Sequence, residues 1–180
     1  MSMIPFSEHP LEPFKYCPVC GSSEFSVNNV KSKKCHTCGF TYYANPSSAT
    51  AAFIVRHGCL LVARRAKEPA KDTLDLPGGF VDMDETVEEG MRREIREETG
   101  LEVRSLDYLF SLPNRYEYSG MTIHTLDMFF RAEVDDDAVP VADDDAATLQ
   151  WVPLDEVRPE LFGLHSIRQA VALYLASHEK

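Results

Sequence analysis

The sequence predicts an α/β protein: a layered domain of β-strands and two main helices that follows a small cysteine-rich module. Several apolar, β-prone segments are interspersed with two segments of helical periodicity, and this mixture is typical of layered α/β domains. Four of the five cysteines fall in two Cys-x-x-Cys pairs near the N-terminus, which indicates a separate stapled unit. We therefore expect an N-terminal arm over residues 1–13, the cysteine-rich module over 14–45 and the α/β domain over 46–180.

Charge and composition narrow the class of protein. At 180 residues the chain is long enough to bury a sizeable core. Its net charge of −11 opposes a general grip on nucleic-acid backbone, which depends on Lys and Arg. No apolar run approaches the ~20 residues of a membrane span, and the first residues lack the basic and apolar regions of a signal peptide. Because paired cysteines of this kind are typical of metal sites in a reducing compartment, we expect a cytoplasmic protein.

The cysteine-rich module has the spacing of a metal site. Its candidate ligands are Cys17, Cys20, Cys35 and Cys38. Gly21 and Gly39 follow the two pairs directly, as tight metal-binding turns require. Four thiolates bind Zn²⁺ tetrahedrally and leave no open coordination position, so we expect a structural zinc ion in a zinc ribbon. The alternative is a redox-active Cys-x-x-Cys motif, which would need only one pair of cysteines. Three lysines form a basic tip that either contacts nucleic acid or is a solvated hairpin: Lys31, Lys33 and Lys34.

Apolar segments define the expected strands. Residues 49–66 are two apolar strands joined by a hairpin-type turn at His57-Gly58. Further strands are expected over residues 24–27, 40–43, 74–81, 103–112, 122–134 and 149–152. The polar, aromatic stretch PNRYEYSGM (residues 113–121) and the acidic stretch 135–145 are expected to be loops.

Two segments are expected to be helices. Thr86, followed three residues later by Glu89, is a capping-box pattern, and Gly100 supplies the left-handed residue that ends a helix. The first helix should therefore run between these positions. An amphipathic segment from residue 165 onward predicts the second helix. Its apolar face is formed by Ile167, Val171 and Tyr174.

The first helix carries more glutamates than solubility requires. At about 100° per residue, one narrow arc of the helix contains Glu94, Glu97 and Glu98. Gly90 lies in that arc one turn earlier, although glycine lowers helix stability by about 1 kcal/mol relative to alanine. A group that approaches the backbone closely at this position would explain the glycine. Oxygen-rich clusters suit hard cations such as Mg²⁺ or Mn²⁺, and Arg93 can orient Glu97 through an i,i+4 pair. The alternative is a solvated acidic face.

The helix and the segment before it resemble a known signature. Gly79, Glu85 and the run from Arg93 to Leu101 match the 23-residue signature of the Nudix hydrolase family without a mismatch. The preceding LDLPGGFV resembles the family's strand into this signature, with Leu74 where Trp is common. The resemblance implies an α/β/α sandwich with a mixed sheet, here preceded by a zinc ribbon as in NADH diphosphatase-like members. It also implies Mg²⁺- or Mn²⁺-dependent hydrolysis of a diphosphate linked to a nucleoside or similar group.

The resemblance also implies roles for individual residues. The expected ligands of the catalytic metal are Glu94, Glu97 and Glu98. Glu94 and Glu97 are also candidates for activating water. Glu85 becomes a supporting carboxylate near the metal, and Arg93 the residue that orients the glutamates. The carbonyl of Gly78 or Gly79 could complete the coordination shell.

Substrate contacts are expected from two other segments. Family members often hold substrate phosphate at the end of the second strand, where this chain has Arg64 and Arg65; arginines at strand ends are also often simply solvated. In PNRYEYSGM, Tyr116 and Tyr118 alternate with charged residues, so both rings could stack on a nucleobase, and Asn114 could bond to its edge. The alternative is that these rings pack against the ribbon or a dimer partner.

The combination of a zinc ribbon with this domain resembles the NADH diphosphatases, including those that act on NAD-capped RNA. Those enzymes carry a Ser-Gln-Pro-Trp-Pro-Phe-Pro motif, whereas the corresponding stretch here, residues 111–116, keeps the serine and first proline and lacks the tryptophan.

Three functions are therefore open. The first is hydrolysis of a nucleoside diphosphate linked to another group, such as ADP-ribose or a dinucleotide-like metabolite. The second is an NADH diphosphatase or NAD-cap RNA hydrolase, and the third is a non-catalytic, nucleotide-sensing regulator. The expected partner is a nucleotide-containing small molecule, with nucleic acid only as a capped-RNA substrate, no membrane, and a homodimer as a candidate assembly.

Overall fold

A computed structural model of the chain describes residues 9–141 and 146–178. The chain divides into two compact units. The larger unit comprises Ser47–Tyr116 and His124–Lys180, and the smaller unit comprises the chain up to Pro46 together with Glu117–Ile123, the tip of one hairpin.

The smaller unit is a three-stranded antiparallel sheet. Its strands, β1 (Phe25–Asn29), β2 (Ser32–Cys35) and β3 (Thr41–Tyr43), lie in the order β1-β2-β3. The sequence prediction missed β2, because its central residues are two lysines that carry no strand signal. Lys33 is only 5% exposed and donates to the carbonyl of Phe14 at 2.8 Å. The expected basic tip is therefore wrong at Lys33.

The described part of the expected arm, residues 9–13, is packed in the smaller unit. Leu11 is buried, and the Nε2 atom of His9 is hydrogen-bonded to the carbonyl of Asn29 at 2.8 Å. Leu11 is therefore anchored within the smaller unit, whereas Glu12 and Pro13 are exposed.

The larger unit is built on one mixed sheet. Its strands are β4 (Ser47–Arg56), β5 (Cys59–Arg65), β6 (Leu74–Asp75), β7 (Gly78–Phe80), β8 (Val103–Tyr118), β9 (Met121–Val134) and β10 (Ala146–Pro153). The main order is β10-β5-β4-β9-β8, with β6 paired to β5 and β7 paired to β4. The β4–β9 pair is parallel and β4 is antiparallel to β5 and β7, so the sheet is mixed as expected. A short 3₁₀ helix (Pro159–Leu161) follows β10.

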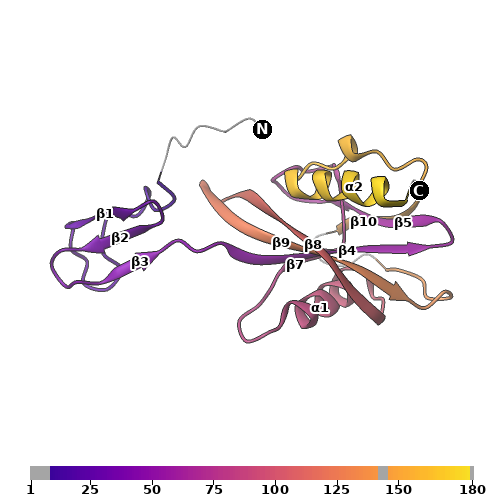
Figure 1. Cartoon of the computed structure of the whole chain (residues 1–180), viewed down its shortest axis with the longest axis horizontal. Helices are drawn as coiled ribbons and strands as arrows, with labels where there is room; N and C mark the ends of the chain where they lie inside the picture. Colours follow the sequence, from indigo (N-terminus) through magenta and orange to yellow (C-terminus); the bar gives the residue numbers. More distant parts are fainter. Residues whose placement is uncertain (1–8, 142–145, 179–180) are drawn as a thin grey trace. The chain divides into compact units, whose positions relative to one another are not determined.

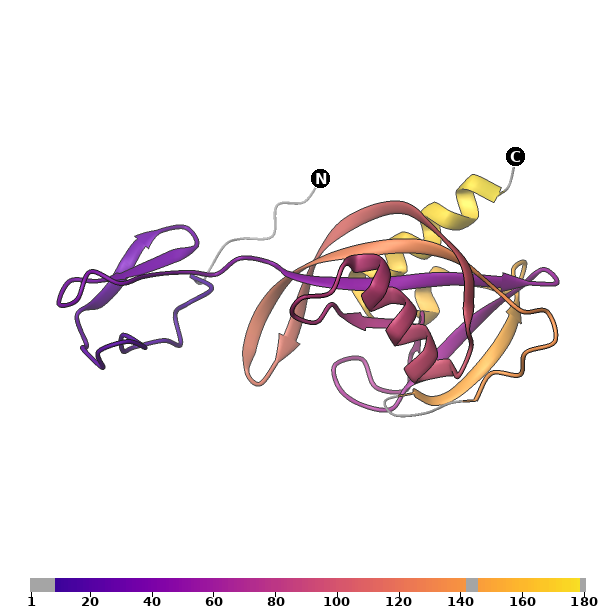
Figure 2. The ribbon, with the colours of Figure 1, turned by 90° about the horizontal axis from the view of Figure 1, so that it is seen from below.

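Helices cover both faces of this sheet. Helix α1 (Val87–Thr99) lies on one face and α2 (His165–His178) on the other (Figures 1 and 2). Because side chains alternate along a strand, Phe53 of β4 joins the core beneath α2, where it stacks on Tyr174 at 4.0 Å between ring centroids. Its neighbour Ile54 joins the core beneath α1 with Ile95. The α/β/α sandwich is therefore confirmed. No helix in the described residues is long and apolar enough to cross a membrane.

The expected loop over residues 113–121 is wrong. β8 continues to Tyr118 and β9 begins at Met121, which leaves only Ser119 and Gly120 as the turn. Both turn residues have positive φ values, 50° and 74°, as a two-residue hairpin of the primed type requires. Of the polar residues that suggested a loop, Arg115 and Glu117 are exposed along the strand, whereas Asn114 is buried.

Truncation of Ile95 should destabilise the larger unit. Ile95 is fully buried in the core under α1, so Ile95→Ala should lower the free energy of unfolding by about 2–5 kcal/mol. Urea unfolding followed by the fluorescence of Trp151, the chain's single tryptophan, measures this loss. Leu173→Ala, on the exposed side of α2, is the matched control and should change the value by about 0.5 kcal/mol or less. Equal losses in both variants would contradict the assigned core.

Candidate active site

Local sequence signals fix the position of helix α1. Its N-cap Thr86 accepts from the amide of Glu89 at 3.2 Å, and the carboxylate of Glu89 accepts from the amide of Thr86 at 2.8 Å. At the other end Gly100 adopts φ 67° and donates to the carbonyl of Arg96. The predicted start and end of the helix are confirmed. Met91 and Ile95 are fully buried, which sets the rotation of the helix and turns its glutamates away from the core.

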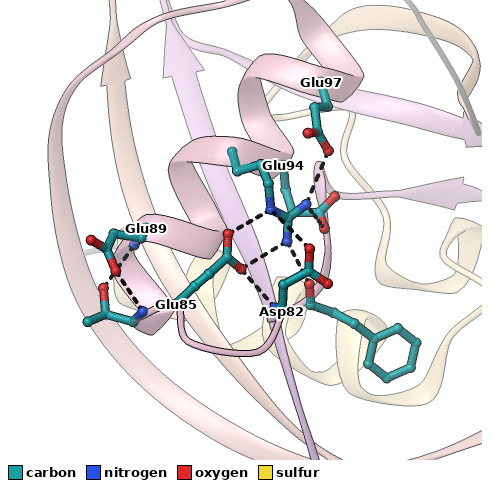
Figure 3. Close-up of polar contacts among 8 residues, drawn as sticks. Asp82, Glu85, Glu89, Glu94 and Glu97 are labelled. Atoms are coloured by element: carbon teal, nitrogen blue, oxygen red, sulfur yellow. Dashed lines mark hydrogen bonds and ion pairs between the residues drawn. The ribbon is translucent and has the colours of Figure 1, made fainter.

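The guanidinium of Arg93 lies at the centre of the site. Its Nε donates to Glu85 at 2.7 Å and its Nη2 to the same carboxylate at 3.0 Å. Its Nη1 donates to Glu94 at 2.8 Å and to Glu97 at 3.1 Å, and Nη2 also donates to the carbonyl of Phe80 at 3.0 Å. Figure 3 shows Glu85, Glu94 and Glu97 converging on this point from the loop and from successive turns of the helix. The structure thus brings four of the predicted catalytic residues together.

Burial and charge make the three carboxylates unequal. The side chain of Glu94 is 14% exposed, whereas that of Glu97 is 55% exposed. Burial raises the pKa of Glu94 above its ordinary value, although Arg93 opposes this rise. Hydrogen bonds from Arg93 and from the amide of Asp82 lower the pKa of Glu85. The cluster therefore offers one enclosed and one accessible carboxylate on consecutive turns of the helix.

Strand β7 approaches α1 with almost no space between them. The amide of Gly78 donates to the carboxylate of Glu98 at 2.9 Å. A Cβ atom on Gly79 would lie 2.6–2.7 Å from the carboxylate of Glu94, so the absence of a side chain there makes room for that group. A Cβ atom on Gly90 would lie 2.9 Å from Glu85. The group that approaches the backbone at Gly90 is thus the carboxylate of Glu85.

The donor set fits a hard cation. All the predicted ligands supply oxygen, which Mg²⁺ and Mn²⁺ prefer, and the cradle at Gly79 seats one carboxylate against backbone that also offers a carbonyl. In the described ranges, Glu94, Glu97 and Glu98 do not bring one carboxylate oxygen each to within 4.8 Å of the other two. Glu94 and Glu97 share one nitrogen of Arg93, while Glu98 is held from the side of β7.

An open groove of about 560 Å³ runs beside the cluster. Its lining includes Glu85, Arg93 and Glu97 together with Asp84, Glu89, Arg92 and Arg96. Two further arginines therefore accompany the carboxylates along α1, which gives the groove both signs of charge.

The two predicted phosphate-binding arginines have different surroundings. Arg64 is exposed and donates to the carbonyl of Asp72 at 2.5 Å. Arg65 is only 17% exposed and donates to the carboxylate of Asp75 at 2.5 Å and to the carbonyl of Pro69 at 2.8 Å. The guanidinium of Arg65 is thus already committed within the protein.

The predicted aromatic contacts also separate. Tyr116 packs edge-on against Phe80, with ring centroids 5.8 Å apart and an interplanar angle of 89°. Tyr118 is 63% exposed at the hairpin tip, and Asn114 is buried on β8. Of these three, Tyr116 is tied by an aromatic contact to the strand that carries Gly79.

Sequence reasoning missed three residues of this region: Phe80, Asp75 and Asp82, whose carboxylate lies 3.8 Å from the Nε of Arg93. Phe80 is large and apolar but 43% exposed. Its position directly after Gly79 in the sequence is the feature that could have marked it as a site residue. Asp75 lies between Leu74 and Leu76, both buried. An acid flanked by buried leucines in a short strand is a signal for a paired buried carboxylate.

The four cysteines of the smaller unit form one cluster. Their sulfur atoms all lie within 4.8 Å of one another, and the pairs Cys17–Cys38 and Cys20–Cys35 are each 3.7 Å apart. Hydrogen bonds from the backbone, first from Cys38, lower the pKa of Cys35 to about 6, which favours the thiolate that metals bind. Among the described residues this is the one group of three or more His, Cys, Asp or Glu side chains assembled in this way.

A comparison with known families agrees with the described fold. Residues 45–173 match the NUDIX domain, so the chain belongs to the Nudix family. It is 29% identical over 164 residues to the NAD-capped RNA hydrolase NudC of Pseudomonas aeruginosa, covering 90% of this chain and 56% of that protein. It is 42% identical over 78 residues to the ADP-ribose pyrophosphatase of Methanocaldococcus jannaschii, covering 42% of this chain and 46% of that protein. The chain thus spans about half the length of the curated relatives it matches.

A solved structure shares the fold over most of the chain. The NUDIX hydrolase of Nitrosomonas europaea superposes with a TM-score of 0.72 over 92% of each chain, at 20% sequence identity. This likeness supports the arrangement of the strands and helices described above.

Replacement of Gly78 should destabilise the larger unit by strain. Gly78 has φ 154°, and an added Cβ atom would lie 2.1 Å from the carbonyl oxygen of Thr50 and 2.7 Å from the Cα of Ala51. Gly78→Ala should therefore lower the free energy of unfolding by about 2 kcal/mol or more. Gly79→Ala is the matched control, because its Cβ meets only the end of the flexible Glu94 side chain, and its loss should be clearly smaller. If the two variants unfold at the same urea concentration, the close approach of β7 to β4 is wrong.

Proposed function

We propose that this protein is a divalent-metal-dependent hydrolase that cleaves the diphosphate of a nucleoside diphosphate linked to another group, such as ADP-ribose or a dinucleotide-like metabolite. The observation that carries the proposal is the cluster of carboxylates on one guanidinium, built within a matched NUDIX domain. The printed functions of the relatives, an ADP-ribose pyrophosphatase and an NAD-capped RNA hydrolase, support the same class of substrate.

The chain's residues supply binding, orientation and proton transfer in this proposal. Glu94, Glu97 and Glu98, with the carbonyl of Gly79, would hold Mg²⁺ or Mn²⁺. When bound, the ion neutralises diphosphate charge and lowers the pKa of a water molecule. Arg93 keeps Glu97 and Glu94 oriented through two bonds from one nitrogen. Glu97 is the more accessible of the two, which favours it as the group that accepts a proton from the attacking water.

A second candidate is hydrolysis of NAD-capped RNA or NADH. It is favoured by the similarity to NudC, which extends over 90% of this chain. Residues 111–116 lack the tryptophan of the Ser-Gln-Pro-Trp-Pro-Phe-Pro motif of NADH diphosphatases. This difference favours a way of recognising the base that differs from theirs. The nucleotide-sensing regulator is the third alternative. The complete cluster around Arg93 speaks against it, because a sensor needs no such arrangement of carboxylates.

We also propose that the four cysteines hold a structural Zn²⁺. A tetrahedron with Zn–S bonds of about 2.3 Å has sulfur–sulfur edges of about 3.8 Å, and two pairs of sulfurs are 3.7 Å apart. The small core of the unit contains two of these cysteines with Phe25, so the metal would supply stability that so few apolar residues do not. A homodimer and a cytoplasmic location stay predictions from the sequence.

The catalytic proposal predicts the behaviour of Glu97. With Mg²⁺ and a panel of ADP-ribose, NADH, NAD, dinucleoside polyphosphates and NAD-capped RNA, the protein should release mononucleotides from ADP-ribose or a dinucleotide. Glu97→Gln should then lower kcat by about 10²–10⁴-fold, the usual contribution of a general base, without loss of folding. Glu88→Gln, an exposed glutamate in the first turn of the same helix, should keep wild-type turnover.

Each result on the panel discriminates between the functions. Rapid cleavage of NADH or capped RNA alone would support the second candidate. Tight binding of a nucleotide without turnover of any compound would support the regulator. Wild-type turnover in Glu97→Gln would contradict the role of this residue.

The zinc proposal predicts the metal content of the smaller unit. Purified protein should contain about one zinc ion per chain, measured by elemental analysis. Cys38→Ser should lose that zinc and expose residues 14–45 to proteolysis, because folding of such units depends on the metal. Cys59→Ser, which alters the cysteine outside the cluster, is the control and should retain both. Protein that is free of zinc and resistant to proteolysis would overturn the assignment.

A further inference from the structure

The smaller unit leaves much of its aromatic surface exposed. Its core is small and contains Cys17, Phe25 and Cys35, with Phe40 packed against them. Outside this core, four aromatic residues are 40–65% exposed: Phe14, Tyr16, Tyr42 and Tyr43. Burial of an aromatic ring is favourable, and grouped exposed apolar residues often mark an interaction site. A ligand that covers some of these rings would explain their exposure.

The strand register assigns two of these rings to one face of the three-stranded sheet. Val27, Lys33 and Tyr42 are register partners across β1, β2 and β3, so their side chains share a face. On this face Lys33 donates to the carbonyl of Phe14, and the ring of Phe14 lies 6.2 Å from that of Tyr42. The segment around Phe14 therefore already occupies part of this face.

The opposite face of the sheet also carries exposed side chains. Ser26, Lys34 and Thr41 form the next row of register partners, and they lie on the opposite face because side chains alternate along a strand. Tyr43 follows Thr41 by two residues and shares that face. Because Lys34 and Tyr43 are both exposed, an ammonium group and an aromatic ring are accessible on the same sheet surface.

This second face is basic in a chain that is acidic overall. The Nζ atom of Lys31, in the turn between β1 and β2, lies 6.0 Å from the centre of the Tyr43 ring, and Lys34 adds a second charge. The three strands contain no Asp or Glu. Of the chain's 29 acidic residues, only three lie within the first 46 residues: Glu8, Glu12 and Glu24. A polyanion is repelled by the net charge of the chain but meets complementary charge at this face.

Lysines beside an accessible aromatic ring match the chemistry of single-stranded nucleic acid. Its phosphates are attracted to ammonium groups, and its unpaired bases stack on aromatic side chains with little dependence on sequence. A protein partner fits this face less well, because Lys is depleted in protein–protein interfaces. A duplex also fits less well, because its bases are not splayed out for stacking on a side chain.

We infer that the face of the smaller unit formed by Lys31, Lys34 and Tyr43 binds single-stranded nucleic acid. One base stacks on the ring of Tyr43, and the backbone phosphates next to that base lie near the two ammonium groups. This binding is independent of the proposed hydrolysis, because it needs neither a diphosphate nor the carboxylates around Arg93.

The test is fluorescence anisotropy with the purified chain and a fluorescein-labelled, single-stranded RNA of about ten nucleotides, within the usual size of such sites. The RNA has a 5′-hydroxyl group and therefore contains no diphosphate. Tyr43→Ala should raise the dissociation constant about tenfold, the order that stacking of one base contributes. Lys34→Gln should raise it at low salt and reduce the slope of log affinity against log salt by about 0.7.

Matched variants separate this face from the rest of the smaller unit. Tyr43→Phe keeps the ring and should bind within about twofold of wild type. Tyr16→Ala and Lys15→Gln make the same chemical changes outside the three strands, at a 65% exposed ring and at a lysine paired with Glu12. Both should also stay within about twofold. If Tyr43→Ala does not fold, the salt slope of Lys34→Gln decides, since Lys34 is exposed.

Several results would overturn the inference. One is the absence of saturable RNA binding by the wild-type protein at low salt. Equal weakening in Lys15→Gln and Lys34→Gln would indicate a general attraction by the charge of the unit. Unchanged RNA binding in folded Tyr43→Ala would also overturn the inference, and dissociation of a dimer in that variant would then assign the face to a second copy of the chain. A failure to hydrolyse any diphosphate on the substrate panel would overturn the proposed function alone.

Discussion

The ion-pair network of Arg93 is the interaction on which the rest of the site depends. Three carboxylates face one another across a short distance and would repel if left alone. One guanidinium bonds to all three and also to the carbonyl of Phe80. These bonds raise the pKa of Arg93 above its ordinary value, which stabilises its positive charge. The network therefore holds an acidic cluster in a defined geometry and ties it to strand β7.

This network is possible only because the backbone comes unusually close to the helix. Gly78 bonds to Glu98 through its amide, and Gly79 leaves room for the carboxylate of Glu94. Side chains at these positions would clash with Thr50 or displace Glu94. The helix in turn cannot rotate away, because Met91 and Ile95 are fully buried on its other side. Core packing and backbone geometry together decide where the carboxylates point.

Short-range signals in the sequence predicted the helix well. The capping box at Thr86, the left-handed Gly100 and the arc of glutamates are local patterns, and each corresponds to an observed contact. The partners of those residues could not be predicted, because they come from distant segments. The loop expected at 113–121 is a strand since pairing with β9 outweighs its polar composition. The pairing of Arg65 with Asp75 depends on the alignment of β5 with β6, which no local pattern records.

Phe80 belongs to two networks that the fold builds from different parts of the chain. Its carbonyl joins the charged network, which lies within the helix and the loop before it, while its ring packs edge-on against Tyr116 of β8. The strands β5, β6 and β8 supply no ligand to Arg93, so Tyr116 reaches the site through the ring of Phe80 and not through the carboxylates. Phe80 links the charged network to the aromatic contact, because the backbone that carries its ring is the backbone that Arg93 binds. The charged network on α1 and an aromatic contact from β8 therefore meet at this one residue of β7.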